Sequence, residues 1–416
     1  MINVDISNIW GSVSLPDLLA LEAEISRAHM ALDPGFPAPP PAENSDELAL
    51  ILDAAQRIRQ MSDAVVVIGP CPAARAAMDL LQGPNRNIGK TKGDPAVYFA
   101  GDSLSPRQMR ELTHLLEGKD YSLCVLPAPE GAVEAGLALR SLRWMLERKY
   151  GTLEARSRIF AVTAGSETTL AKLAEDNEWE VFPLPDGVNT PYLALSAAEL
   201  LPMAAAGLDV RALVRGAEEA REELNLRSFE NPVWLYAAVR CLLKKTGKTA
   251  ELLAGWEPGM ESLGAWHRQL FAQADSLGLF PTAATYPAAI YNLSPILAAS
   301  GSQLLETLVR FAPPEFSSPI APDALDTDNL NYLSGKTLDY VADQSFDALV
   351  QSHTDAGVSI VTADCDVLCE KTLGALFRFF QLSCAICGQV LGAAETAVSY
   401  PAALAQNLGS PESADI

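Results

Sequence analysis

The chain has 416 residues, of which 49% are hydrophobic and 20% are charged, a composition typical of a folded globular protein and unlike that of a disordered chain. Its formal net charge of −22 argues against nucleic acids and anionic membranes as partners, because both are bound through lysine and arginine contacts to phosphates. The length exceeds that of one ordinary hydrophobic core, so we expect two domains of similar size.

The N-terminus and the cysteines predict a cytoplasmic protein. Residues 1–7 contain neither the basic region nor the apolar region of a signal peptide. No uncharged apolar run reaches the length of about 18 residues that a membrane-spanning helix needs. The seven cysteines are an odd number spread over a long chain, which fits a reducing compartment better than a disulfide framework.

Residues 1–45 are predicted to form an N-terminal helical segment followed by a proline-rich strap. Apolar residues recur at helical spacing over 16–32. Closely spaced prolines over 34–44 favour an extended polyproline conformation or a linker. Ser45 stands before an acidic turn and is predicted to cap the helix that follows.

Residues 46–200 alternate between strand and helix patterns. Short apolar runs predict buried strands at 64–68, 97–100, 122–126, 158–162 and 180–182. Helical patterns separate them at 72–81, 105–116, 133–150 and 168–177. Parallel strands need crossover helices, so this alternation predicts an α/β domain built on a doubly wound parallel sheet.

The second half of the chain is predicted to begin with a helical connection over 201–255. A second α/β domain is expected over 256–395, and a polar tail over 396–416. The candidate strands of this domain are 288–291, 305–310 and 358–362, and its long helices are expected at 337–356 and 371–393.

Two blocks of sequence carry a family resemblance. The first extends over 158–209 and includes Ile159-Phe-Ala-Val-Thr163, Asp186-Gly-Val188 and Leu200-Leu-Pro. The second is Trp266-His-Arg-Gln-Leu-Phe271, which leads to Gly278-Leu-Phe-Pro281. In order and spacing, these blocks resemble the glucose-6-phosphate isomerase family, whose members are built from two sugar isomerase (SIS) domains.

The resemblance implies both a fold and a biological setting. We expect two SIS-type (flavodoxin-like) α/β/α sandwich domains with parallel sheets, together with helical N- and C-terminal extensions. The family resemblance also implies a homodimer, a sugar or sugar-phosphate ligand and a place in glycolysis and gluconeogenesis. It implies no cofactor, and the sequence contains neither a Walker nor a Rossmann fingerprint.

The reaction of this family needs a carboxylate base, a cation beside the enediolate and an acid or base for ring opening. Where the motifs match, the base position holds Gln273, whose amide cannot abstract a proton from carbon. The position of the cationic arginine holds Pro191, and the segment of the ring-opening histidine holds Asn292 instead. Asp275 lies two residues beyond Gln273 and is a candidate for a displaced carboxylate.

The phosphate-binding motifs of the family are altered as well. The segment 127–134 lacks every hydroxyl of the family pattern, contains two prolines and keeps only Glu134. The glycine-rich turn after the first strand keeps Gly69, but Pro70 removes a backbone donor. Gly69, Cys71 and Glu134 are the remaining candidates for contacts to a substrate. Cys71 is also a candidate reactive thiol, because a helix N-terminus lowers the pKa of a cysteine.

A second group of cysteines has two interpretations. Cys384 and Cys387 form a CxxC pair near Cys365 and Cys369, and four thiolates could bind zinc. The pair falls inside an apolar helical run, where small buried cysteines pack well, and this interpretation is favoured. We therefore predict no metal site.

The sequence predicts a glucose-6-phosphate isomerase-like protein that has lost the catalytic residues of its family and acts in binding or regulation. Two alternatives stay open. One is an enzyme with altered chemistry on an unphosphorylated or cationic ligand. The other is a divergent isomerase with rearranged catalytic residues, which would remain an intramolecular oxidoreductase.

Overall fold

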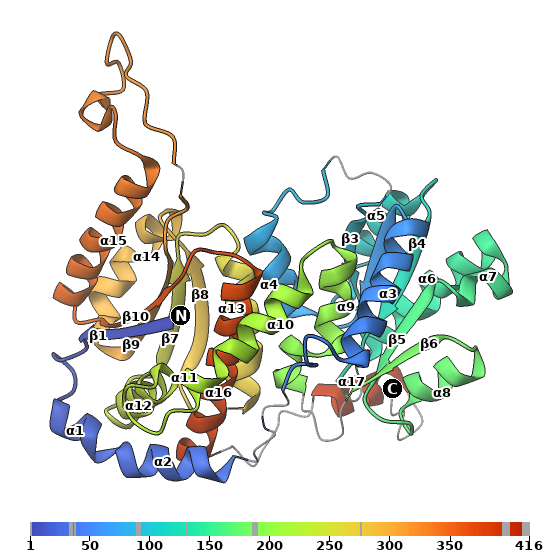
Figure 1. The fold of residues 1–416 in the computed structure, drawn as a ribbon, viewed down its shortest axis with the longest axis horizontal. Helices are drawn as coiled ribbons and strands as arrows, with labels where there is room; N and C mark the ends of the chain where they lie inside the picture. Colours follow the sequence, from blue (N-terminus) through green and yellow to red (C-terminus); the bar gives the residue numbers. More distant parts are fainter. Residues whose placement is uncertain are drawn as a thin grey trace. The chain divides into compact units, whose positions relative to one another are not determined.

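The computed structural model describes residues 2–32, 36, 39–88, 93–129, 132–184, 190–274, 277–315, 317–392 and 400–409. The chain divides into two compact units. One contains residues 33–218 and 394–416 and is called the 33–218 unit; the other contains residues 1–32 and 219–393 and is called the 219–393 unit. Each unit is a five-stranded sheet covered by helices (Figure 1), so the predicted α/β fold is confirmed.

The sheet of the 33–218 unit is entirely parallel and has the strand order β3-β2-β4-β5-β6. Its strands are β2 (Ala64–Ile68), β3 (Ala96–Ala100), β4 (Tyr121–Val125), β5 (Ile159–Thr163) and β6 (Glu180–Pro183). The three central strands are buried along their whole length, as expected for parallel strands covered on both faces. All five strands predicted in this part of the sequence are confirmed within one residue at each end.

One face of this sheet carries a continuous apolar cluster formed with helices that follow the strands. These helices are α5 (Pro106–Leu116), α6 (Val133–Tyr150), α7 (Thr152–Arg156) and α8 (Thr169–Asp176). Ser105 and Thr168 cap α5 and α8 by accepting hydrogen bonds from backbone N–H groups. Alanine and leucine side chains on one stripe of α6 contribute to the cluster, which fixes this helix against the sheet.

A second group of helices packs together without contributing to that cluster. It consists of α3 (Asp46–Met61), α4 (Pro72–Leu81) and α9 (Ala197–Ala205), with η1 (Thr190–Leu195) beside α9 and α10 (Val210–Glu219) after it. The predicted cap at Ser45 is confirmed, since its side chain accepts a hydrogen bond from the Leu48 N–H at 3.2 Å. The helix α17 (Tyr400–Leu408) completes the described part of this unit.

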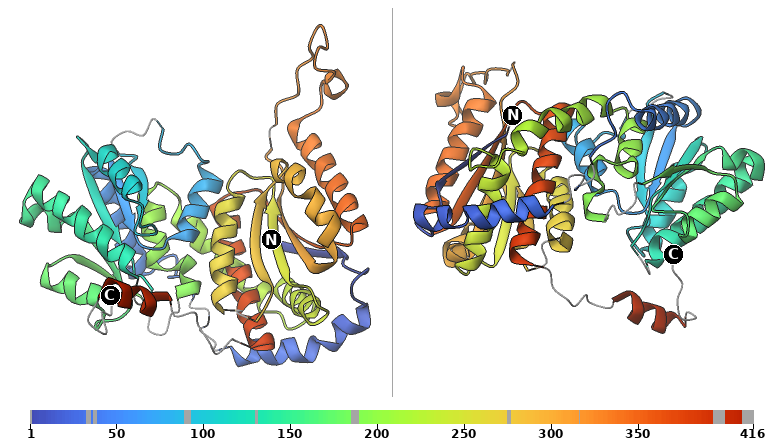
Figure 2. Two further views of the ribbon diagram at one scale, coloured as in Figure 1. Left: turned by 180° about the vertical axis from the view of Figure 1, so that it is seen from behind. Right: turned by 60° about the horizontal axis from the view of Figure 1, so that its bottom comes forward.

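The sheet of the 219–393 unit has the order β1-β10-β9-β7-β8 (Figure 2). Its strands are β1 (Ile2–Asn8), β7 (Ala250–Gly255), β8 (Phe280–Thr285), β9 (Leu304–Phe311) and β10 (Ser359–Cys365). Only β1 is antiparallel, and it pairs with β10. The helices are α1 (Leu15–Ala20), α2 (Glu22–Ala31), α11 (Arg221–Leu224), α12 (Pro232–Lys245), α13 (Met260–Ala274), α14 (Ala288–Ser300), α15 (Leu338–Asp355) and α16 (Glu370–Leu391), with short 3-10 turns η2 (Gly301–Gln303) and η3 (Asn331–Leu333).

Three features of this unit differ from the sequence prediction. The segment 288–291 is the first turn of α14 and not a strand, because a short apolar run does not by itself distinguish a strand from a helix. The region predicted as a helical connection, 201–255, ends in the buried strand β7. The strands β1 and β8 were not predicted, because each lies at an edge of the sheet and depends on pairing with distant residues.

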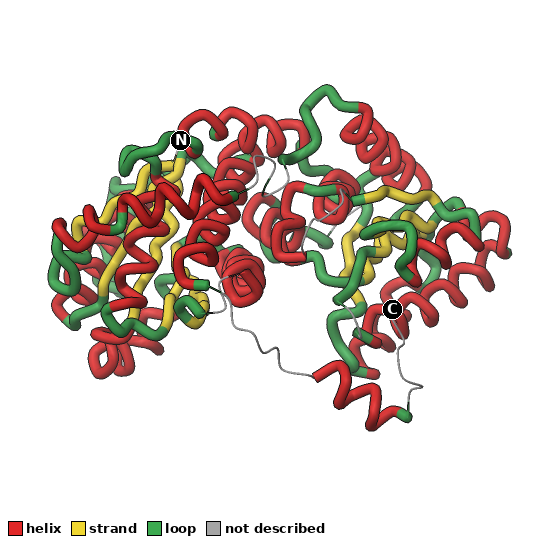
Figure 3. The backbone as a smooth tube through the Cα atoms, turned by 90° about the horizontal axis from the view of Figure 1, so that it is seen from below, coloured by secondary structure: helices red, strands yellow, loops and turns green. Residues whose placement is uncertain are grey.

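The helix α16 is long and apolar enough to cross a membrane by length and composition, but it is a core helix of this unit. It packs against α12, α13 and α2. Figure 3 shows the strands of this unit side by side, with helices packed around them. Cys384 and Cys387 are buried on α16, and their thiols point to the carbonyl oxygens of Leu270 and Ala237 at 3.5 and 3.8 Å. This confirms the interpretation of the pair as core residues.

A buried ionic group joins α12 to the middle of this sheet. Glu251 on β7 accepts hydrogen bonds from Arg240 Nε at 2.7 Å and from Thr307 Oγ1 at 2.6 Å, and also from the Tyr236 hydroxyl. Burial opposes ionisation of Glu251, but Arg240 and the other donors together lower its pKa to about 2. The carboxylate is therefore ionised and paired inside the core.

An extended arm joins β9 to α15 and projects from this unit (Figure 1). We define it as residues 317–337. Its two ends pair through an isolated antiparallel β-bridge between Pro319 and Thr337. Apolar side chains on the arm are open to solvent; Leu325 is 81% exposed and Tyr332 is 71% exposed. Apolar groups exposed in this way commonly mark an interaction surface.

Candidate functional site

The carboxyl ends of the strands in the 33–218 unit form the expected location of a ligand site. In doubly wound sheets, ligands bind where the strand order reverses, and here it reverses at β2, with β3 on one side and β4 on the other. Gly69 stands directly after β2 with a φ of +112°, a region that favours glycine. A Cβ at this position would lie 3.2 Å from the Leu126 carbonyl oxygen, so the turns after β2 and β4 are in close contact.

The turn after β2 leads directly into α4. Cys71 is the N-cap residue of this helix, and its side chain makes no capping hydrogen bond to the helix backbone within the described residues. Pro72 is the first helical residue, so the first exposed backbone donors are the N–H groups of Ala73 and Ala74. Such N–H groups at a helix N-terminus form a site for an anion.

In this protein, a carboxylate of the chain itself occupies those donors. Glu199 on α9 accepts a hydrogen bond from the Ala74 N–H at 2.7 Å and a longer one from the Ala73 N–H at 3.4 Å. The Cys71 thiol lies 3.1 Å from the same carboxylate. Glu199 is only 3% exposed, so the first turn of α4 is closed to solvent on this side.

Burial changes the acid–base properties of both side chains. It raises the pKa of Glu199 to about 7, although the amides of Ala74 and Ala73 and the Cys71 thiol partly offset this effect. Burial and the neighbouring Glu199 raise the pKa of Cys71 well above its usual range. Cys71 is therefore a protonated thiol at neutral pH, which argues against the reactive-thiol interpretation.

The N-terminus of α6, which the family pattern assigns to phosphate, has few donors to offer. Glu134 lies half-buried in the first turn of α6, and Ala132 precedes the helix without a side-chain cap among the described residues. A Cβ on Gly101 would lie 2.9 Å from the Ala135 Cα, so the turn after β3 packs directly onto this helix.

The remaining predicted positions lie on other elements. Pro191 lies half-buried in η1 of the 33–218 unit. Gln273 is exposed in the last turn of α13, and Asn292 is exposed on α14, where its side-chain amide donates to the Ala288 carbonyl at 3.5 Å. Asp275 lies outside the described residues. Gly69 and Cys71, two residues apart in the sequence, lie in the same turn before α4.

Sequence reasoning missed Glu199, which is the central side chain of this turn. A signal was present, because Glu199 is the only charged residue between Asp186 and Asp209. A lone acid in an apolar helix is rarely buried without a partner. The partners here are backbone N–H groups and a thiol from a segment more than 120 residues earlier, as the separations of 128 and 125 residues show.

Comparison with known proteins adds sequence relatives and structural neighbours. No family model matches the chain. It is 36% identical over 356 residues to the glucose-6-phosphate isomerase of Staphylococcus aureus strain Newman, which covers 84% of this chain and 80% of that protein. The same degree of identity extends to the enzyme of strain Mu50 of that organism.

Two solved structures share the fold. The glucose-6-phosphate isomerase of Chlamydia trachomatis aligns with a TM-score of 0.69 at 13% identity, over 93% of this chain and 77% of that one. A hypothetical protein from Thermus thermophilus aligns with a TM-score of 0.82 at 18% identity, over 99% of this chain and 100% of that one. At these identities the two structures support the fold alone.

Proposed function

The chain belongs to the glucose-6-phosphate isomerase family, and we propose that within this family it is a non-catalytic member that acts in binding or regulation. The observation that carries the proposal is the Glu199 carboxylate on the first turn of α4. Its oxygens occupy the N–H groups that would otherwise receive an anionic group of a ligand. A second anion at this turn would meet these oxygens in a buried setting, with a like charge on them once Glu199 is ionised.

The residues at the family's catalytic positions support the same proposal. Gln273 and Asn292 are neutral amides, and Pro191 has neither a charge nor a donor. A proton transfer between adjacent carbons needs a base of suitable pKa, and the enediolate needs a nearby cation. None of these three side chains supplies either group.

One observation favours the alternative of a divergent isomerase with altered substrate or rearranged residues. The identity of 36% extends over 80% of a protein named for the isomerase reaction. Under this alternative, a carboxylate such as Asp275 or Glu199 would serve as the base. The pKa of about 7 for Glu199 is in the range of a general base, which makes it the residue to test first.

A coupled isomerase assay separates the two proposals. The purified protein is incubated with glucose 6-phosphate and, separately, with fructose 6-phosphate, and a bona fide isomerase prepared in the same way serves as the positive control. We expect no turnover above the background of a mock preparation. Turnover that disappears in Glu199→Gln or in Asp275→Asn would establish the divergent isomerase instead.

The proposal includes a homodimer in the cytoplasm. The exposed apolar side chains of the arm over 317–337 offer a surface for a second copy of the chain. All seven cysteines are free thiols, and six of them are buried, which fits a reducing compartment. A sugar or sugar phosphate remains the proposed class of ligand for the family fold.

A further inference from the structure

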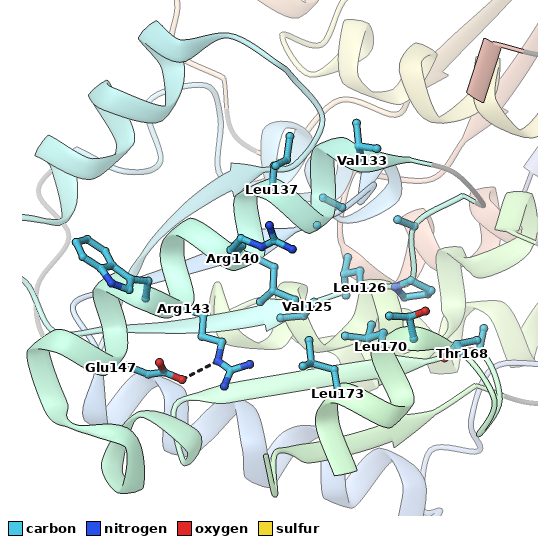
Figure 4. A pocket seen from close by; sticks show the side chains of 18 residues that line it. Val125, Leu126, Val133, Leu137, Arg140, Arg143, Glu147, Thr168, Leu170 and Leu173 are labelled. Atoms are coloured by element: carbon cyan, nitrogen blue, oxygen red, sulfur yellow. Dashed lines mark hydrogen bonds and ion pairs between the residues drawn. The ribbon is translucent and has the colours of Figure 1, made fainter. Parts of the chain in front are cut away.

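A cavity lies in the 33–218 unit at the carboxyl end of β4. It has a volume of about 610 Å³, within the usual range for small-molecule sites. Its walls are α6 and α8, and its floor is the end of β4 (Figure 4). The helices α3, α4 and α9 contribute no lining residue, so this cavity is separate from Glu199.

The floor and walls of the cavity are apolar. Val125 at the end of β4 and Leu126 directly after it line the cavity together with Leu139 from α6 and Leu173 from α8. Two large apolar side chains extend this surface toward solvent, since Leu137 is 50% exposed and Trp144 is 57% exposed. Both side chains line the cavity, so an apolar ligand would cover apolar surface that is otherwise in water.

The two arginines of the cavity have different roles. Arg143 is held in place, because its guanidinium donates to Glu147 at 2.6 Å and to Asn177 at 2.6 Å and stacks over Trp179. Arg140 lies one helical turn earlier and has no hydrogen bond or ion pair with any residue that the structure describes. Arg140 is thus the cation available to a ligand.

The lining charges favour an anion even though the protein as a whole is acidic. Two arginines face one glutamate, Glu147, so the lining carries a net positive charge. The whole chain carries −22, which makes this a local reversal of sign. A guanidinium next to an apolar surface suits a ligand with an apolar body and one carboxylate, sulfonate or phosphate group.

We propose that the cavity between α6 and α8 binds a small organic anion whose apolar body lies on Leu139 and Leu173 and whose charged group pairs with Arg140. The cavity shares Pro127, Ala128 and Val133 with the segment that the family pattern assigns to phosphate, but its cation, Arg140, lies outside that segment. The proposal does not depend on the proposed loss of catalysis. It adds a ligand-binding function to a chain whose helix N-terminus at α4 is already occupied.

Two fluorescent probes of similar shape test the charge preference. The anionic probe is 8-anilinonaphthalene-1-sulfonate, and the neutral probe is N-phenyl-1-naphthylamine. We expect saturable binding of the anionic probe by the folded protein. In Arg140→Gln, affinity for the anionic probe should fall about tenfold, while affinity for the neutral probe changes less than about twofold.

Variants locate the probe. Ala164 is an exposed residue of the lining, so Ala164→Trp should fill the cavity and abolish binding of both probes. Gly136→Phe fills it from α6 and replaces that variant if Ala164→Trp does not fold by circular dichroism. Arg110→Gln, an exposed arginine on neighbouring α5, is the matched control and should leave both affinities unchanged.

Three results would overturn the proposal. The first is the absence of saturable binding of the anionic probe. The second is binding that persists in the folded cavity-filling variant, which would place the probe elsewhere. The third is an equal loss of affinity for the anionic and the neutral probe in Arg140→Gln, which would show that the arginine acts through the fold and not through its charge.

Discussion

The Glu199 carboxylate accepts a hydrogen bond from the backbone N–H of Ala74 at 2.7 Å, and this contact joins α9 to the first turn of α4. The two residues are 125 positions apart in the sequence. A carboxylate is favoured at a helix N-terminus both by the exposed N–H groups and by the helix dipole. The backbone N–H groups at the N-terminus of α4 are therefore hydrogen-bonded by a side chain of the protein itself. They lie at a turn where the family resemblance implies contacts to a substrate.

Removal of this carboxylate should create a site that a small free anion can fill. In Glu199→Ala, the N–H groups of Ala73 and Ala74 lose their acceptor, and we expect a destabilisation of about 2 kcal/mol. Sodium formate at high concentration should restore part of the loss in unfolding temperature, because it binds only the folded variant. Sodium chloride at equal ionic strength is the control. An identical change in unfolding temperature with both salts would contradict the proposal that Glu199 occupies an anion site at the N-terminus of α4.

The pKa of Glu199 predicts a pH dependence of stability. Its folded value of about 7 lies above the ordinary value of 4.5, so the folded state binds the proton more tightly. The stabilisation is complete below pH 4.5 and is lost as the pH rises through 7. Relative to Glu199→Gln, the wild type should lose up to about 3 kcal/mol of unfolding free energy between pH 4.5 and 8. Urea unfolding of both proteins across this range measures the difference, and a constant difference would refute the shift.

Much of the 33–218 unit follows from its sequence alone. Runs such as Ala64–Ile68 are apolar throughout, which is typical of strands buried on both faces, and capping residues such as Ser45 and Ser105 set where helices begin. Local signals sufficed here because each strand is followed by its own crossover helix. Glu199 could not be assigned a role in this way, because its partners come from a distant turn.

The strands of the 219–393 unit show where local signals fail. The strand β7 has the sequence Ala-Glu-Leu-Leu-Ala-Gly, whose residues favour helices, and it is a strand because it is buried between β8 and β9. Pro281 weakens the strand pattern of β8, yet it is tolerated at an edge strand. Tertiary contacts override propensity in both segments.

The buried pair of Arg240 and Glu251 predicts a non-additive effect on stability. Both side chains are fully buried, so Arg240→Met leaves the Glu251 carboxylate in the core without its arginine partner and should cost about 3–5 kcal/mol. The double variant Arg240→Met, Glu251→Leu removes both charges and should recover most of that loss. Chemical unfolding of the wild type, both single variants and the double variant gives the coupling. Additive losses in the double variant would mean that the pair is not coupled.

If the arm over 317–337 forms the dimer interface, substitutions on it should change the oligomeric state of the protein. Leu325 and Tyr332 are exposed on it, so a charged residue at either position should leave the fold of the unit intact and weaken association. Light scattering after size exclusion should give the mass of a dimer for the wild type and of a monomer for Leu325→Asp with Tyr332→Asp. Asp328→Asn, on the same arm, is the control. An unchanged mass in the double variant would place any interface elsewhere.

Restoring one catalytic group should not restore the reaction. In Gln273→Glu, the base position regains a carboxylate, and a general base contributes roughly 10²–10⁴-fold to a rate. Pro191 still supplies no cation for the enediolate, a group whose loss costs about another 10²–10³-fold. Glu199 still occupies the N–H groups of Ala73 and Ala74. We therefore expect no turnover of glucose 6-phosphate in Gln273→Glu, with Gln273→Asn as the matched control. Activity gained in the glutamate variant alone would show that the remaining machinery is intact and would contradict the proposed loss of catalysis.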